Sequence, residues 1–274
     1  MSVLRVGRVF VLLAAFGLQP FAARGQQPSC TTNVLINTKS GLICGLGPAT
    51  SGPAVSQYLG IPYAQAQRWQ SPQPRSWTST FLATQLGNVC PQPLKENFIR
   101  TPTCPPPPGQ DEDCLNLNIW VPQGASSGSP LPVMVFIHGG GFFVGSGEQP
   151  LDNGAKLAAA GKVIVVTLNY RLGALGFLVQ PSSSLTGNLG FLDQIEALQW
   201  IKDNIKAFGG DAQNVTLFGE SAGAMSVGLH ALSSPRSLVL FKAGLMESNP
   251  LGLAYMTPRQ ASDVRERFFA PFAS

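Results

Sequence analysis

The sequence predicts an α/β fold whose sheet is mostly parallel, and three observations support this class. Short, almost continuously apolar runs, typical of strands covered by helices on both faces, occupy residues 131–137, 163–168, 215–218 and 243–246. Residues 193–207 instead repeat isoleucine and leucine at helical spacing, and Gly209 follows as a helix stop. Strand and helix patterns alternate along the chain, as they do in βαβ architectures.

The other segments fit around this alternation. Residues 34–74 predict a short, strand-rich lead before the main sheet, and a proline-rich loop lies near residues 104–109. The polar stretch 123–130 predicts a solvated turn and not a linker between domains. No internal repeat is evident, and residues 265–269 carry no motif that assigns them.

A G-x-S-x-G motif covers residues 219–223. It comes directly after the strand 215–218 and directly before a helix predicted over residues 224–232, which is the setting that a nucleophile elbow requires. Ser221 is therefore the candidate nucleophile. The alternative, for an isolated motif, is that Ser221 only caps the helix.

A glycine run, residues 139–141, follows His138 at the end of the predicted strand 131–137. Glycine lets backbone N–H groups approach a ligand without interference from a Cβ atom. Such a loop, with the residue after the nucleophile, supplies the donors of an oxyanion hole. The candidate donors are the amides of Gly140, Gly141 and Ala222. An ordinary loop is the alternative, but the loop and the elbow in this order favour one acyl-transfer site.

The chain contains two histidines, and a serine nucleophile needs a histidine base within hydrogen-bond reach. His230 lies nine residues beyond Ser221 on the same predicted helix, which places it about 13 Å along the axis. His138 opens the glycine loop, where a structural role is the alternative. The sequence therefore predicts that neither histidine is the base. The carboxylates after the serine are Glu247, Asp263 and Glu266.

Longer strings extend the pattern beyond the site, at residues 58–64, 112–118, 169–173, 187–194 and 208–211. With the elbow and the glycine loop, they resemble the type-B carboxylesterases, the carboxylesterase and cholinesterase branch of the α/β-hydrolases. The resemblance runs from about residue 34 to about residue 250 and matches the N-terminal half of such an enzyme. It implies the α/β-hydrolase fold, a mostly parallel twisted sheet with flanking helices, truncated after the nucleophile region.

By this resemblance the protein is a serine carboxylesterase that hydrolyses small carboxylic esters through an acyl-enzyme at Ser221. His138 would shape the oxyanion loop and not accept a proton. Glu220 would lie near the family's histidine and favour its protonated form, unless it is only a polar residue of the elbow. The triad glutamate and histidine belong to the unmatched half, so residues 1–274 alone are expected to be inactive. The alternatives are a non-catalytic, cholinesterase-like binding or adhesion domain and a non-functional gene fragment.

The resemblance also assigns a disulfide between Cys90 and Cys114. Choline selectivity in the family draws on a tryptophan in the loop between these cysteines, where this chain has only Phe98 as an aromatic, which favours neutral esters. The odd number of cysteines leaves the partners open for Cys30, Cys44 and Cys104. There is no CxxC pair or His/Cys cluster, so neither a metal nor a cofactor is expected.

Two ion pairs follow from the same resemblance. Arg171 is expected to meet Asp193, and Arg68 is expected to meet Glu112. Each pair would join segments that are distant in sequence. The alternative is that all four are solvated surface charges, which is the usual fate of these residue types.

The first 25 residues predict a cleaved secretory signal peptide. Arg5 and Arg8 precede an apolar run of about ten residues, too short to favour a membrane anchor, which needs roughly 20. Residues 26–274 would then be a partial α/β-hydrolase domain, secreted or periplasmic, with a glycosylation triplet at Asn214. Removing three arginines and no acid lowers the formal net charge from +4 to +1. No nucleic-acid partner and no membrane span are expected, and the oligomeric state is left open.

Overall fold

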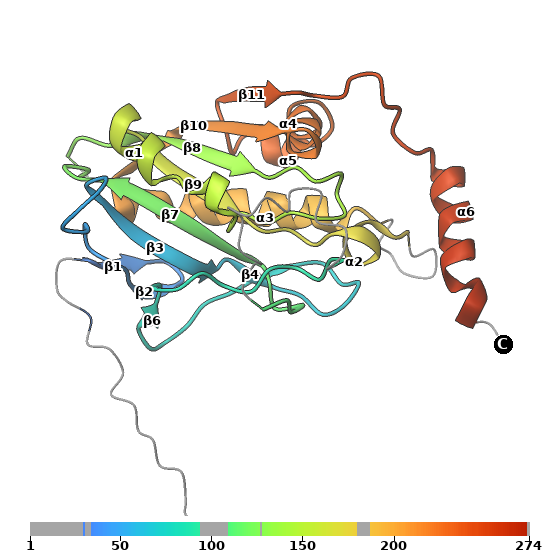
Figure 1. The fold of residues 1–274 in the computed structure, drawn as a ribbon, viewed down its shortest axis with the longest axis horizontal. Helices are drawn as coiled ribbons and strands as arrows, with labels where there is room; N and C mark the ends of the chain where they lie inside the picture. Colours follow the sequence, from blue (N-terminus) through green and yellow to red (C-terminus); the bar gives the residue numbers. More distant parts are fainter. Residues whose placement is uncertain (1–29, 31–33, 94–108, 127, 180–186, 273–274) are drawn as a thin grey trace, which may run out of the picture.

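The main sheet is mixed, six-stranded and mostly parallel (Figure 1), in a computed structural model that describes residues 30, 34–93, 109–126, 128–179 and 187–272. Its strand order is β11-β10-β8-β9-β7-β3. The strands are β3 (Val55–Pro62), β7 (Asn116–Pro122), β8 (Leu131–Ile137), β9 (Ile164–Leu168), β10 (Gly210–Glu220) and β11 (Ala243–Glu247). The four strands from β11 to β9 are parallel, whereas β7 is antiparallel to both β9 and β3. The predicted fold class is therefore confirmed.

The strand-rich lead forms two small sheets beside the main one. One contains β1 (Leu35–Thr38), β2 (Gly41–Cys44) and β6 (Phe81–Leu82), and the other contains β4 (Ala64–Gln65) and β5 (Gln73–Pro74). Of the predicted main strands, β8 has the expected bounds, but β10 begins five residues earlier than its apolar run. Residues 210–214 are mostly polar, and the pairing with β8 shifts register between Gly210 and Val215. This part of the strand therefore has neither the apolar run nor the regular alternation by which a strand is predicted from sequence.

Helices cover both faces of the sheet. They are α1 (Ala155–Gly161), α2 (Gly173–Phe177), α3 (Leu189–Asn204), α4 (Ala222–Leu232), α5 (Pro235–Leu238) and α6 (Pro258–Phe269), with the 3-10 turns η2 (Pro150–Asp152), η3 (Ile205–Phe208) and η4 (Ala270–Phe272). Successive residues of a strand point to opposite faces. Trp120 packs with Ala158 of α1, whereas its neighbour Ile119 belongs to the main core with Leu198 of α3. Helices α1 and α3 therefore lie on opposite faces.

The helix predicted over residues 193–207 begins earlier and ends earlier than expected. Gly187 and Asn188 both have left-handed backbone angles, with φ of 87° and 59°, and they turn the chain directly into α3 at Leu189. After Asn204 the helix tightens into η3 and ends at Gly209, whose φ of 82° makes it the predicted stop. The isoleucine spacing that predicts this helix begins at Ile195, so it does not mark the first turn of α3.

A buried ion pair joins the end of β9 to α3. Arg171 donates from Nε to Asp193 Oδ2 at 2.8 Å and from Nη2 to Asp193 Oδ1 at 2.6 Å, and its Nη1 reaches Gln70 O at 2.8 Å. The two side chains are 5% and 0% exposed, so this pair is not a set of solvated charges. Arg68 also pairs with Glu112, with Nε at 2.9 Å from Oε1, but that pair lies at the surface.

Two disulfides are present in the described part of the chain. Cys90 is bonded to Cys114, as expected, with Cα atoms 5.0 Å apart. Cys30 is bonded to Cys44, with Cα atoms 5.7 Å apart, which fills part of the assignment that the sequence left open. Cys104 lies outside the described residues.

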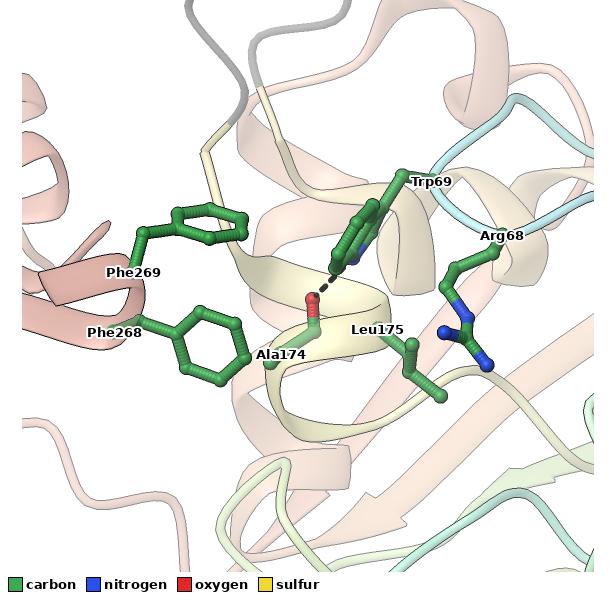
Figure 2. Close-up of a pocket in the computed structure, with 6 residues that line it drawn as sticks. All are labelled: Arg68, Trp69, Ala174, Leu175, Phe268 and Phe269. Atoms are coloured by element: carbon green, nitrogen blue, oxygen red, sulfur yellow. Dashed lines mark hydrogen bonds between the residues drawn. The ribbon is translucent and has the colours of Figure 1, made fainter. Parts of the chain in front are cut away.

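The segment without a motif forms α6, which lies apart from the sheet and beside α2 (Figure 1). Its start is a capping box between Thr257 and Gln260, a T-x-x-Q pattern that the sequence did contain. Figure 2 shows Phe268 and Phe269 of α6 facing Trp69 beside α2, around an apolar pocket of about 410 Å³. The Trp69 indole donates to Ala174 O at 3.0 Å. No residue of the elbow or glycine loop lines this pocket.

The edge strand β11 is exposed along its whole length. Leu245 and Met246 are 47% and 49% exposed, and only β10 pairs with this strand among the described residues. An apolar strand edge of this kind is a template for further pairing. Within the described residues, no helix has both the length and the apolar character needed to cross a membrane.

Replacing Asp193 by asparagine is expected to lower the free energy of unfolding by about 3–5 kcal/mol, because it leaves the Arg171 charge buried without its partner. The matched control is Asp203→Asn, since Lys39 and Asp203 pair at 2.6 Å with side chains 71% and 36% exposed. The control should change stability by less than about 1 kcal/mol. Urea unfolding measures the free energy of unfolding of both variants. Equal losses in the two would contradict the claim that burial makes the Arg171–Asp193 pair more costly to break than an exposed pair.

Candidate active site

The elbow places Ser221 between the last residue of β10 and the first residue of α4. Its backbone has φ of 55° and ψ of −118°, a strained conformation for a residue with a side chain. Ser221 N donates to Glu247 O at 3.0 Å, and Ser221 O accepts from Met225 N at 2.9 Å. The neighbouring strand and the first turn of the helix therefore hold the strained residue in place. Ser221 alone makes the turn from β10 to α4, so the helix begins at Ala222, two residues earlier than predicted.

The glycines of the motif are required by contact with the end of β8. A Cβ atom on Gly223 would lie 1.9 Å from Ile137 O, and one on Gly219 would lie 2.7 Å from the same oxygen and 2.6 Å from Gly223 C. No side chain fits at either position unless the backbone moves. The elbow is thus pressed against the point where β8 leads into His138.

The peptide between Gly139 and Gly140 is fixed by His138. The Nδ1 atom of His138 lies 2.8 Å from Gly139 O, and because a carbonyl oxygen only accepts, Nδ1 carries the proton. In a trans peptide the N–H points opposite to the C=O. The N–H of Gly140 therefore points away from the His138 ring.

The next peptide is fixed in the same way. Gly140 O accepts from Phe143 N at 3.0 Å and from Val144 N at 3.1 Å, which directs the N–H of Gly141 away from this turn. The φ angles of Gly140 and Gly141, 98° and 62°, are both in the left-handed region. Neither N–H donates in any hydrogen bond between described residues. The loop thus offers two successive N–H donors that have no partner in the part of the chain that the structure describes.

The glycine loop and the elbow lie against each other. A Cβ atom on Gly139 would lie 3.3 Å from Ser221 Cβ and 2.7 Å from Glu220 Oε2. The third candidate donor is the N–H of Ala222, the first residue of α4. N–H groups of the first helical turn lack intrahelical partners, and the positive end of the helix dipole lies there. The structure therefore brings together all the residues that sequence reasoning assigned to the elbow and the glycine loop.

His138 is enclosed behind the loop. Its ring stacks on Tyr170 with centroids 4.3 Å apart, and the Tyr170 hydroxyl donates to His138 O at 2.9 Å. Burial lowers the pKa of His138 to about 4, so the ring is neutral near pH 7. Its proton on Nδ1 is committed to the loop carbonyl, which fits a structural ring better than a base.

His230 lies between α4 and α3, away from the elbow. Its Nε2 is 3.0 Å from Gln194 Oε1, and its ring stacks on Phe191 with centroids 4.3 Å apart. Burial lowers its pKa to about 3. No group of three or more His, Cys, Asp or Glu side chains that could hold a metal ion occurs within the residues described above.

Asp152 and Glu148 were missed by sequence reasoning. Asp152, at the end of η2, has its pKa raised to about 7, first by burial and then by the charge of Glu220. Glu148 is buried, and its carboxyl group accepts from Asn169 Nδ2 at 3.3 Å. Burial raises the pKa of Glu148 to about 8, against the opposing effect of hydrogen bonds from Asn169 and the Gly87 backbone. Neither residue belongs to a motif, so no signal in the sequence marked them.

Comparison with known proteins gives one consistent family. The profile of the Carboxylesterase family matches residues 32–270. The chain belongs to the carboxylesterase family. It is 43% identical over 247 residues to para-nitrobenzyl esterase of Bacillus subtilis (strain 168), covering 86% of this chain and 47% of that protein. It is 44% identical over 223 residues to cholinesterase of Mus musculus, covering 78% of this chain and 36% of that protein.

Solved structures of carboxylesterases agree in fold. A "thermophylic PNB esterase" aligns with a TM-score of 0.78 at 42% identity, covering 88% of this chain and 49% of that one. A "PNB esterase" aligns with a TM-score of 0.76 at 42% identity, covering 87% and 48%. The fold is therefore that of the α/β-hydrolases. The chain spans about half the length of these solved carboxylesterases and less than half of the two curated relatives.

The titration of Glu148 is expected to lower the free energy of unfolding as pH rises. The fold keeps this proton up to about pH 8, whereas the unfolded chain releases it near 4.5, so between these values stability falls by up to about 1.4 kcal/mol per pH unit. Glu148→Gln removes the titration, and its advantage over the wild type should grow from pH 5 to pH 8 in urea unfolding. Glu266→Gln, at an exposed position of α6, is the control. A constant difference across this range would contradict a buried, protonated Glu148.

Proposed function

We propose that the protein is a carboxylic-ester hydrolase in which Ser221 is the nucleophile. The observation that carries this proposal is the strained serine at the elbow, packed against a loop with two N–H groups that have no partner among the described residues. A strained nucleophile beside preorganised donors is the arrangement used for acyl transfer. Membership of the carboxylesterase family supports the same reaction.

In the proposed reaction, Ser221 Oγ attacks the ester carbonyl and the alcohol leaves, which gives an acyl-enzyme that water then hydrolyses. The amides of Gly140, Gly141 and Ala222 stabilise the oxyanion of each tetrahedral intermediate. His138 holds the first of these amides through Gly139 O. A base is also needed, and we propose that a histidine and a glutamate come from polypeptide outside residues 1–274.

Glu220 is proposed to act by its charge. It is exposed and lies beside the nucleophile, where a carboxylate favours the protonated form of a nearby histidine. Asp152 is coupled to it, because the charge of Glu220 raises the Asp152 pKa. We therefore propose that both Glu220 and Asp152, and not Glu220 alone, contribute to the electrostatic field at the histidine.

The proposed substrates are small neutral esters. The names of the two relatives, para-nitrobenzyl esterase and cholinesterase, both refer to ester hydrolysis. The loop between Cys90 and Cys114 offers only Phe98 for stacking against a quaternary ammonium, and that residue lies outside the described part. This composition favours neutral esters over choline esters.

We also propose that residues 1–25 are a secretory signal peptide and that residues 26–274 form a partial α/β-hydrolase domain, secreted or periplasmic. The two disulfides support an oxidising compartment. The residues of the signal peptide lie outside the described part of the chain. Asn214 is half-buried within β10, which disfavours a glycan there.

Residues 26–274 alone are expected to show no serine-dependent turnover, because both histidines are engaged elsewhere and loss of a triad member typically costs around 10⁴-fold. The exposed β11 edge should also cause association in size-exclusion chromatography. An extended form, with the C-terminal half of the Bacillus subtilis relative fused after Ser274, should be monodisperse and hydrolyse p-nitrophenyl butyrate. Ser221→Ala should abolish this activity. Monodisperse residues 26–274 with turnover that Ser221→Ala removes would overturn the assignment of the base.

Gly141→Val in the extended form is expected to lower turnover on the order of a hundredfold by displacing an oxyanion donor. Gly141 is the informative glycine because its Cβ would meet nothing closer than 3.7 Å, whereas a Cβ on Gly140 would collide with Val144 O at 2.1 Å. Gly124→Val is the matched control, since Gly124 also has a positive φ, 91°, and open space around it. Equal turnover of the two variants, both folded, would remove this amide from the mechanism.

A further inference from the structure

The back of the oxyanion loop is held by a side chain that belongs to no motif of the site. Gln92 makes two hydrogen bonds to one residue of the loop: its Nε2 donates to Gly145 O at 2.9 Å, and its Oε1 accepts from Gly145 N at 2.9 Å. The amide thus pairs with the backbone as a neighbouring strand would. Only an amide, or an acid that carries its proton, has one donor and one acceptor side by side for this pairing.

Gln92 is itself anchored on the disulfide side. Its Nε2 also donates to Cys90 O at 3.1 Å, and its backbone N donates to Gln110 Oε1 at 2.9 Å. Cys90 is fixed by its bond to Cys114. The side chain is therefore a short and well-supported link between the disulfide and the loop.

Gly145 passes the constraint on to the glycine run. Its φ of 111° is in the left-handed region, and a Cβ atom there would lie 2.5 Å from His138 Nδ1 and 2.7 Å from Gly139 O. The backbone of Gly145 thus lies directly against the hydrogen bond that orients the peptide between Gly139 and Gly140. A displacement of Gly145 would change that bond and with it the direction of the Gly140 N–H.

We propose that Gln92 is a positioning residue for the oxyanion hole, acting through Gly145 and the His138–Gly139 hydrogen bond on the amide of Gly140. This inference rests on the proposed ester hydrolysis. Gln92 touches neither substrate nor nucleophile in this role. Gln92 would affect the direction of the Gly140 N–H. Small misplacements of such donors lower the rate, because the charge that they stabilise develops only in the transition state.

Two substitutions separate the link from general stability. Gln92→Ala removes all three side-chain hydrogen bonds. Gln92→Glu keeps the shape and the acceptor for the Gly145 N–H, but its ionised form cannot donate to Gly145 O or Cys90 O, and its protonated form can donate to only one of them. The carboxylate should therefore still bond the Gly145 N–H at pH 8, and the bond to Gly145 O should return only as pH falls toward the ordinary carboxyl pKa of about 4.3. Gln65→Ala, at an exposed glutamine of β4, is the matched control.

The first measurement is amide hydrogen exchange at Gly145 in the 274-residue chain, corrected for intrinsic rates. Gln92→Ala should accelerate exchange at least about tenfold, because the Gly145 N–H loses its acceptor. Gln92→Glu keeps an oxygen that accepts from the Gly145 N–H, so exchange in this variant should stay slower than in Gln92→Ala at both pH 5 and pH 8. Unchanged protection in Gln92→Ala would overturn the proposed link, whatever the activity of the chain.

The second measurement is hydrolysis of p-nitrophenyl butyrate by the extended form. Gln92→Ala should lower kcat on the order of ten- to hundredfold with KM within about twofold. The ratio of Gln92→Glu to wild-type kcat should rise as pH falls from 8 to 5, because protonation restores a donor for Gly145 O. Wild-type turnover with an unaffected Gln92→Ala variant would overturn the positioning role. If the extended wild type is itself inactive, the proposed function fails, and Gly145 exchange still decides whether Gln92 holds the loop.

Discussion

The site depends on one steric constraint, the contact between the elbow and the end of β8. A Cβ on Gly223 would come within 1.9 Å of Ile137 O, so the turn that carries Ser221 approaches this strand as closely as two backbones can. Because His138 follows Ile137 directly, the same contact brings the glycine loop to the serine. The nucleophile and the proposed oxyanion donors are therefore neighbours as a consequence of strand order, with β8 and β10 adjacent in the sheet.

A second layer of hydrogen bonds then orients the backbone of the loop. His138 Nδ1 fixes the carbonyl of Gly139, Tyr170 fixes the carbonyl of His138, and Gln92 fixes both polar groups of Gly145. In planar peptides, holding the carbonyls on one side leaves the N–H groups on the other side available. The orientation of the loop peptides is thus set by His138 and Gln92, which are not themselves proposed to contact the substrate.

Much of the fold could be predicted from the sequence because its signals are local. The apolar runs predict the parallel strands, the isoleucine spacing predicts most of α3, and the T-x-x-Q pattern at Thr257 is a local mark of the start of α6. The start of β10 could not be predicted, since residues 210–214 are mostly polar and are held by pairing with β8 across a shift in register. The pairing of Cys30 with Cys44 also needed coordinates, because an odd number of cysteines fixes no partner.

The sequence by itself determined the candidate site of this protein: a serine in an elbow motif, a glycine run before it, and two histidines whose positions argue against a base. These follow from residue type and from spacing along one element, which sequence carries directly. Only the tertiary structure decided which groups contact the glycine loop, namely Gln92 on Gly145 and the neutral ring of His138, and that desolvation raises the pKa values of Glu148 and Asp152. The physical reason is that hydrogen-bond partners and desolvation depend on distances between segments far apart in sequence, such as the 53 residues between Gln92 and Gly145.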